Sequence, residues 1–176
     1  MPYPEPLVQP MRGELTRLGV EELRTADAVD AVDAAFEQAQ DDTMLLIINS
    51  ICGCAAANAR PAVALARRTP VQPERYVTVF AGQDLEATAR ARAYLGGLPP
   101  SSPFLALFKN GDPVYVIERR HIEGRSANAI AADLVTAFEK YCSTGEMAED
   151  TPASGRSDGT GEARASERRR WWRLGR

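Results

Sequence analysis

Two of the three cysteines in this chain, Cys52 and Cys54, are separated only by Gly53, at the end of an apolar run. Two thiols this close can form a redox pair, contribute half of a metal site, or be chemically inert. Thiolates are the reactive and metal-binding form of cysteine, so the choice depends on the surroundings of the pair.

A structural zinc site needs four ligands, and the chain offers few. Besides Cys52 and Cys54 it has only Cys142 and a single histidine, His121. Cys142 falls on the apolar stripe of a predicted helix, which favours a buried small hydrophobe. His121 follows two arginines near a predicted strand end, which favours a surface or structural role. No metal is therefore predicted, although two thiols could still carry Cu(I) or help to deliver an iron–sulfur cluster.

The cysteine pair lies at a predicted junction between a strand and a helix. Residues 43–49 form a continuous apolar run of strand length, and residues 53–68 are alanine-rich and favour a helix that Pro61 should kink. Cys52 falls between them, where unpaired backbone N–H groups and the helix dipole stabilise an anion. Its thiol pKa should therefore lie below the ordinary value of about 8.5, whereas Cys54 should be more enclosed.

A disulfide between Cys52 and Cys54 is geometrically accessible. Residues two apart in a turn or helix have Cα atoms roughly 5–6 Å apart, within the range that a disulfide bridges. Their side chains start in different directions, and we expect the backbone freedom of Gly53 to bring them together. The ring should be strained and easily reduced, which suits a transient catalytic disulfide.

The remaining pattern predicts a mixed sheet. Residues 1–10 should be an extended lead-in before a helix at 11–24 that breaks near Gly19. The further predicted elements are a helix at 26–40 capped by Thr25 with Val29, Val32, Phe36 and Ala39 on one face, a strand at 75–82, a helix at 85–95 capped by Asp84, strands at 104–108 and 113–118, and a final helix capped by Ser126 with Ile130, Leu134, Phe138, Tyr141 and Cys142 in a stripe. Pro113 should lengthen the Asn-Gly hairpin loop beyond two residues.

A βαβ unit followed by a ββα unit gives a central, mixed four-stranded sheet with helices on both faces, preceded by extra N-terminal helices. This α/β layout is that of the thioredoxin fold. In that fold a proline just before the third core strand is cis and packs beside the cysteine pair. Pro103 has the matching position, so we expect it to be cis and to help dock an extended substrate.

Composition indicates one domain with a tail. The chain has 176 residues, 44% of them hydrophobic, and a net charge of −3, so nothing overall points to nucleic acid. We predict a domain at 1–145 and a disordered, arginine-rich tail at 146–176 that contains Trp171 and Trp172 and is more often an unstructured end than a binding segment. The chain begins without an apolar signal region and no apolar run could span a bilayer, so a cytoplasmic location is expected.

The residues resemble the bacilliredoxin family, thioredoxin-like proteins with a Cys-Gly-Cys motif. The similarity runs over about residues 4–142 and includes "NSICGCAAANARP", "GGLPPSSPFLALFKNG" and "RRHIEGRSANAIAADLVTAFEKYC". It implies a thiol–disulfide oxidoreductase that removes bacillithiol from bacillithiolated client proteins. Cys52 would attack and Cys54 would resolve, while Gly53 and Pro103 would contact the substrate.

The same resemblance implies the partners. Bacillithiol would be the thiol substrate, no cofactor would be bound, and a disulfide reductase or bacillithiol-disulfide reductase would recycle the enzyme. Two alternatives stay open. One is a general protein disulfide isomerase or reductase, and the other is a Cu(I) or iron–sulfur binding protein built on Cys52 and Cys54.

Overall fold

The computed structural model describes residues 2–24 and 27–143. Thr25, predicted as a helix cap, and the predicted tail at 146–176 lie outside the described residues. The elements, in chain order, are α1 (Glu5–Thr16), β1 (Glu21–Glu22), α2 (Ala28–Gln38), β2 (Thr43–Asn49), the π-helical turn η1 (Ala55–Ala59), α3 (Arg60–Ala66), β3 (Arg75–Phe80), α4 (Leu85–Ala93), β4 (Phe104–Lys109), β5 (Asp112–Ile117), the 3-10 turn η2 (Arg119–His121) and α5 (Ala127–Tyr141).

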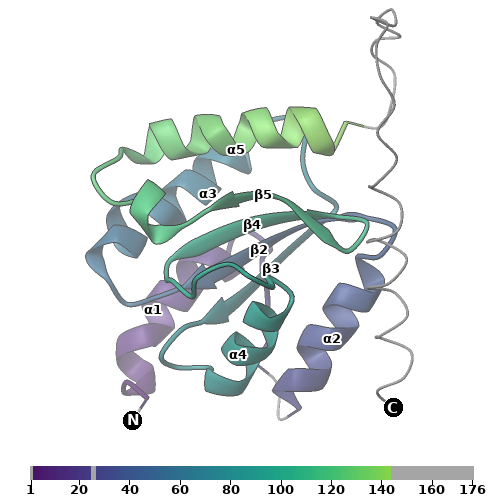
Figure 1. The fold of residues 1–176 in the computed structure, drawn as a ribbon. Helices are drawn as coiled ribbons and strands as arrows, with labels where there is room; N and C mark the ends of the chain where they lie inside the picture. The colour runs from purple at the N-terminus through teal and green to yellow at the C-terminus, as the bar shows by residue number, and fades with distance from the viewer. Residues whose placement is uncertain (1, 25–26, 144–176) are drawn as a thin grey trace, which may run out of the picture. The chain divides into compact units, whose positions relative to one another are not determined.

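The sheet has the strand order β1-β3-β2-β4-β5 (Figure 1). β2 pairs with β3 in parallel and with β4 antiparallel, and β4 and β5 form an antiparallel hairpin. The βαβ and ββα units and their mixed pairing are as predicted, and the chain has the thioredoxin-like α/β fold. The predicted number of four strands is wrong. A short fifth strand, β1, pairs with β3, and its two glutamates carry no apolar strand pattern that could have predicted it.

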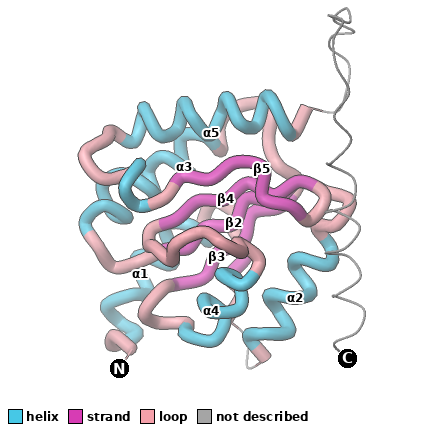
Figure 2. The backbone as a smooth tube through the Cα atoms, in the orientation of Figure 1, coloured by secondary structure: helices cyan, strands magenta, loops and turns pink. Residues whose placement is uncertain are grey.

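Helices cover both faces of the sheet (Figures 1 and 2). α3 and α5 pack together on one face, and α2 and α4 pack together on the other. Strand β2 serves both layers. Leu45 and Ile47 belong to the apolar cluster under α3 and α5, whereas Met44, Leu46 and Ile48 belong to the cluster under α2 and α4. Burial on both faces is why the run is continuously apolar.

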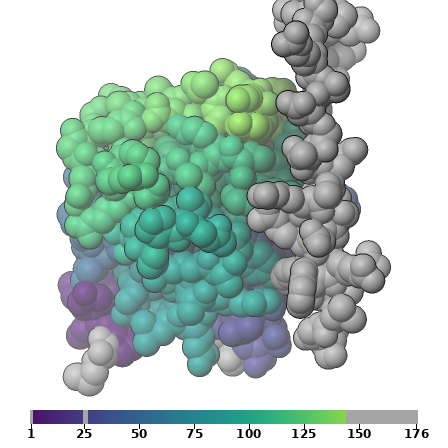
Figure 3. Space-filling model, in the orientation of Figure 1, coloured from purple at the N-terminus to yellow at the C-terminus, as the bar shows by residue number. Residues whose placement is uncertain are grey.

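Side chains from distant parts of the chain form one continuous surface over this frame. In the space-filling view the green side chains of the α5 region lie above the teal side chains of the α4 region (Figure 3).

Across residues 2–24 and 27–143, no helix has both the length and the apolar composition needed to cross a membrane.

The prediction of an extended lead-in over residues 1–10 is wrong. Residues 5–16 form a helix, although the prolines predicted an extended lead-in up to residue 10. Pro6 is tolerated because the first helical turn has no intrahelical partners for its N–H groups. Pro10 lies inside α1, where burial of Val8, Arg12 and Leu15 offsets the lost hydrogen bond. On the next helix, α2, the predicted apolar face holds at Val32, Phe36 and Ala39 but not at Val29, which is exposed.

The hairpin is tighter than predicted. Lys109 pairs with Asp112, so the loop is the two residues Asn110 and Gly111, with φ values of 52° and 80°. Both values are left-handed, as the favoured two-residue hairpin turn requires. Pro113 lies inside β5 rather than in the loop. It is tolerated because β5 is an edge strand, with a register shift beside the partner Phe108.

Two of the three predicted helix caps lie within the described residues, and they have different outcomes. Ser126 caps α5 as predicted, because its side chain accepts a hydrogen bond from the N–H of Ala129. Asp84 stands at the N-cap position of α4 but makes no capping hydrogen bond. Its carboxylate instead accepts hydrogen bonds from Arg12 and from the N–H of Phe80. The buried Arg12 therefore binds the Asp84 carboxylate that the local sequence predicted as the cap of α4.

Candidate active site

The Cys-Gly-Cys motif lies where the predicted strand-to-helix junction placed it. β2 ends at Asn49, and helical backbone begins at Gly53. Cys52 and Cys54 are joined by a disulfide, with Cα atoms 5.4 Å apart, inside the expected range. The two thiols can therefore close a ring within a single turn of chain.

The sulfur of Cys52 receives two hydrogen bonds. The N–H of Ala55 lies 3.3 Å from Cys52 Sγ, and the hydroxyl of Ser50 lies 3.3 Å from it. The carbonyl of Cys52 accepts hydrogen bonds from the N–H groups of Ala55 and Ala56, which begins the helical ladder. A sulfur in this position faces the positive end of the helix, which stabilises negative charge on it.

Cys54 and Gly53 differ in their surroundings. Cys54 is partly buried and packs against the apolar cluster under α3 and α5. Gly53 is exposed, and a Cβ added to it would meet nothing within 4 Å. Its backbone is helical and is not among the positive-φ glycines, so ring closure does not use the special freedom predicted for it. A contact between Gly53 and a substrate stays a prediction.

Pro103 lies at the same edge of the sheet as the cysteines. Ile48 pairs with Phe104, so the residues after β2 and the residues before β4 meet there. Pro103 is buried, and the Ser102–Pro103 peptide bond is cis, as predicted. A contact between Pro103 and a substrate stays a prediction.

The predicted interruption at Pro61 takes the form of a π-helical turn. η1 occupies Ala55–Ala59 directly after Cys54, and the N–H of Arg60 reaches back to the carbonyl of Ala55. A proline cannot donate a hydrogen bond to the carbonyl four residues earlier, and a widened turn accommodates that loss. Such turns are common at functional sites because they redirect the side chains that follow.

Cys142 and His121 are not brought to the pair. Cys142 is buried at the end of α5 and has Thr43 among its neighbours, at the opposite end of β2 from Cys52. A strand of this length spans roughly 20 Å, so Cys142 cannot join Cys52 and Cys54 around one metal ion. His121 is exposed at the end of η2. Within residues 2–24 and 27–143, no group of three or more His, Cys, Asp and Glu side chains could hold a metal ion.

A Cys142→Ala variant should keep its exchange activity within about twofold and lose only ~1 kcal/mol of stability, as a small core truncation does. Burial raises the pKa of the Cys142 thiol. At pH 8, below that raised pKa, Cys142 holds less thiolate than an ordinary cysteine, and its reactivity should increase as the pH rises. The reduced, native protein is alkylated briefly and analysed by mass spectrometry. Cys142 should be alkylated at least ~10-fold more slowly than Cys52. Equal labelling of the two residues would contradict this prediction.

Two residues of the site carried no assignment from sequence. Ser50 touches the sulfur of Cys52, and the buried Arg60 contacts the loop that contains Ser50. The signal that could have found Arg60 is its isolation, because it is the only charged residue between positions 55 and 66. A lone charge in an alanine-rich helix on a buried face needs a buried partner.

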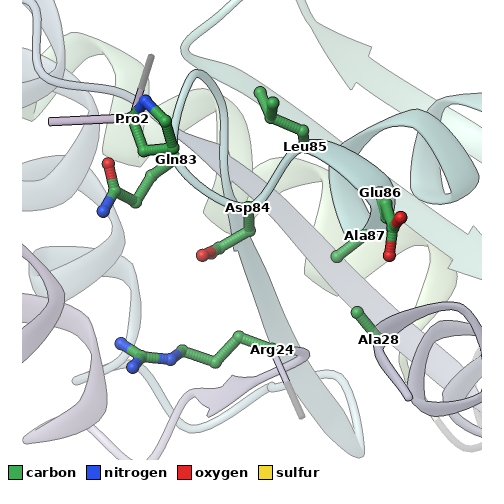
Figure 4. A pocket seen from close by; sticks show the side chains of 8 residues that line it. All are labelled: Pro2, Arg24, Ala28, Gln83, Asp84, Leu85, Glu86 and Ala87. Carbon is green, nitrogen blue, oxygen red and sulfur yellow. The ribbon is translucent and has the colours of Figure 1, made fainter. Parts of the chain in front are cut away.

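An open pocket of about 330 Å³ lies apart from the cysteines (Figure 4). It is bounded by Pro2, Arg24, and the start of α4 around Leu85, and its lining includes neither cysteine nor Pro103. Arg24 is ion-paired with Glu5, so the pocket presents no unpartnered cation to a ligand. The pocket therefore adds no group to the Cys52–Cys54 site.

The fold and the paired thiols at a helix start define the class of protein, a thioredoxin-like thiol–disulfide oxidoreductase. Comparisons with known proteins agree with this class. The sequence model of a family described as disulphide isomerase matches residues 3–142. A bacilliredoxin of Salinibacter ruber is 64% identical over 163 residues, which cover 92% of this chain and 94% of that protein. Bacilliredoxins of Koribacter versatilis and Geobacillus kaustophilus are 50% and 47% identical, each over 80% of this chain and 94% of theirs.

The chain belongs to the bacilliredoxin family. Among solved structures, oxidised thioredoxin from Plasmodium falciparum is a distant match, with 16% identity and a TM-score of 0.43 over 70% of this chain and 99% of that one.

Proposed function

We propose that this protein removes bacillithiol from S-bacillithiolated client proteins in the cytoplasm. The observation that carries the proposal is the pair Cys52–Cys54, with Cys52 Sγ facing the start of the helix, in a chain that is 64% identical to a relative named bacilliredoxin. No bound cofactor is needed, because the thiols themselves carry the two electrons. Bacillithiol is the thiol substrate, and Gly53 and Pro103 are the proposed contacts for the incoming chain.

The exchange proceeds in two balanced steps. The Cys52 thiolate attacks the bacillithiol sulfur of the mixed disulfide, so that a Cys52–bacillithiol disulfide forms and the client leaves as a thiolate. The Cys54 thiolate then attacks Cys52 Sγ, and bacillithiol leaves as a thiolate. The client has been reduced by two electrons and the pair Cys52–Cys54 oxidised. A disulfide reductase or bacillithiol-disulfide reductase would return those two electrons, and two protons restore the thiols.

The helix start supports this division of roles. Its N–H groups favour a thiolate at Cys52 under conditions where an ordinary cysteine is mostly protonated. Cys52 and Cys54 are both partly buried. Cys54, two residues further on, is bonded to Cys52 in the oxidised state, so its sulfur lies within reach of a mixed disulfide at Cys52. An intramolecular attack by Cys54 needs no diffusion, so it can outpace a second thiol from solution.

The test uses a Cys54→Ser variant incubated with a bacillithiolated client protein, followed by intact-mass measurement. We expect a stable Cys52–bacillithiol adduct and release of the reduced client, because the resolving thiol is missing. A Cys52→Ser variant is the matched control and should form no adduct. If Cys54→Ser forms no adduct while the wild type binds Cu(I) tightly at one equivalent, the metal-carrier alternative replaces this proposal.

A general disulfide isomerase is the second candidate, favoured by the description of the matching family model. The two enzymes differ in substrate preference rather than in chemistry. With equal concentrations of a bacillithiolated client and of a protein with a non-native disulfide, the proposed function predicts faster reduction of the bacillithiolated client. Preference for the protein disulfide would favour the isomerase.

A further inference from the structure

Ser50 is fixed by three hydrogen bonds in the loop between β2 and Cys52. Its N–H donates to Oδ1 of Asn49 at 2.8 Å, and its carbonyl accepts from Nη1 of Arg60 at 3.1 Å. Its hydroxyl donates to Cys52 Sγ at 3.3 Å. The residue is 6% exposed, so water has little access to compete for these groups. These hydrogen bonds hold the N–H and the carbonyl of Ser50, and its hydroxyl faces the sulfur of Cys52.

Arg60 provides the outer support of this loop. Its guanidinium also donates to Oδ1 of Asn49 at 3.1 Å, and its Nε donates to Glu14 at 2.7 Å. The Arg60 side chain is 2% exposed, whereas Glu14 is 40% exposed. A buried cation is unfavourable unless its donors are paired. Here the donors join α3, α1 and the loop that precedes Cys52.

We propose that Ser50 is a further catalytic residue and that Arg60 is its positioning residue. The hydroxyl of Ser50 donates a hydrogen bond to the reacting sulfur of Cys52 and stabilises its thiolate, while Arg60, held by Glu14, keeps the loop in place. The inference rests on Cys52 as the attacking sulfur, as in the proposed function. The charged and titratable groups that these contacts bring to the loop are Arg60, Glu14 and Cys54.

The expected effect has a distinctive dependence on pH. Loss of one hydrogen bond to a thiolate should raise the Cys52 pKa by roughly one unit. A higher pKa lowers the thiolate fraction but makes each thiolate a stronger nucleophile, with a Brønsted coefficient of about 0.4–0.5. Ser50→Ala should therefore react about threefold slower below both pKa values and about threefold faster above both. A merely structural defect would not invert with pH.

The experiment measures the rate at which Cys52 exchanges with a small aromatic disulfide against pH in a Cys54→Ser background, with and without Ser50→Ala. Ser50→Thr keeps a hydroxyl and should restore the parent profile. Thr136→Ala removes an exposed hydroxyl on α5 and should leave the profile unchanged. Arg60→Met should shift the Cys52 pKa in the same direction as Ser50→Ala. In the disulfide-forming parent, Ser50→Ala should make the Cys52–Cys54 reduction potential more negative, because the thiolate loses stabilisation.

Two outcomes overturn the inference. One is superposition of the Ser50→Ala and parent profiles, and the other is a decrease of equal size at every pH. If Ser50→Ala does not fold, as judged by circular dichroism, the Arg60→Met profile decides instead, and its superposition on the parent profile overturns the inference. Exchange with a small aromatic disulfide requires no bacillithiol, so this test stands or fails separately from the proposed substrate.

Discussion

A Cys52→Ser variant is expected to reduce mixed disulfides at least about 10³-fold more slowly than the parent chain, because removal of a catalytic nucleophile has effects of this size or larger. Serine does not ionise near neutral pH, so the hydrogen bonds from Ala55 and Ser50 would face a neutral hydroxyl. The measurement is the turnover of a fluorescent mixed-disulfide reporter with a small dithiol as reductant.

The matched control for that loss is Cys54→Ser, which lacks the same disulfide but keeps Cys52. In a single-turnover assay it should release the first leaving thiol at a rate near that of the parent, and then stop. Comparison of the two variants separates loss of the nucleophile from loss of the ring. The opposite result, with Cys54→Ser inactive in the first step and Cys52→Ser active, would reverse the assigned roles.

An Arg12→Met variant should lose about 3–5 kcal/mol of unfolding free energy, the usual result of removing one member of a buried ion pair. Arg12 is 3% exposed and donates to both carboxylate oxygens of Asp84, at 2.9 and 2.8 Å, and to Glu22 at 3.0 Å. Burial opposes its charge, but the hydrogen bonds to Asp84 and Glu22 outweigh burial and raise the Arg12 pKa. Without Arg12, the Asp84 carboxylate, 11% exposed, loses its counter-ion.

Urea unfolding of the full chain, followed by circular dichroism, measures this effect. Arg24→Met removes an exposed ion pair with Glu5 on the same part of the protein and should cost less than about 1 kcal/mol. The double variant Arg12→Met/Asp84→Asn should recover part of the loss, because the unpaired buried charge is gone. If Arg12→Met and Arg24→Met were equally mild, the buried ion pair would not hold the N-terminal helix to the sheet.

The cluster around Arg12 also explains the errors at the N-terminus. It joins α1, β1 and the start of α4, and it holds the N-terminal segment beside the sheet. Glu21 and Glu22 form a strand because they lie beside Val77 and Thr78 of β3, not because their own side chains favour one. The helix at 5–16 forms despite its prolines because its buried residues pack against the rest of the domain, including α3.

Local sequence patterns predicted most of the candidate active site. The apolar run of β2 predicted a strand buried on both faces, and the alanine-rich segment after it predicted a helix, so the position of Cys52 at their junction followed. The cis bond at Pro103 needed the fold as context, since an isolated X-Pro bond is cis only about 5–6% of the time. The hairpin error at Pro113 arose because edge-strand status depends on strand order, which no local pattern reports.

By itself the sequence determined the spacing of the thiols, the strand-to-helix junction that exposes Cys52 to backbone N–H groups, and the βαβ and ββα order of the fold. These features depend on neighbours within a few residues and on hydrophobic periodicity, and both are present in the amino-acid sequence itself. Tertiary structure alone decided which charges meet. Arg12 pairs with Asp84 across 72 residues, and Arg60 pairs with Glu14 across 46. Such partners are set by packing of distant elements, and through Arg60 that packing places the hydroxyl of Ser50 at the sulfur of Cys52.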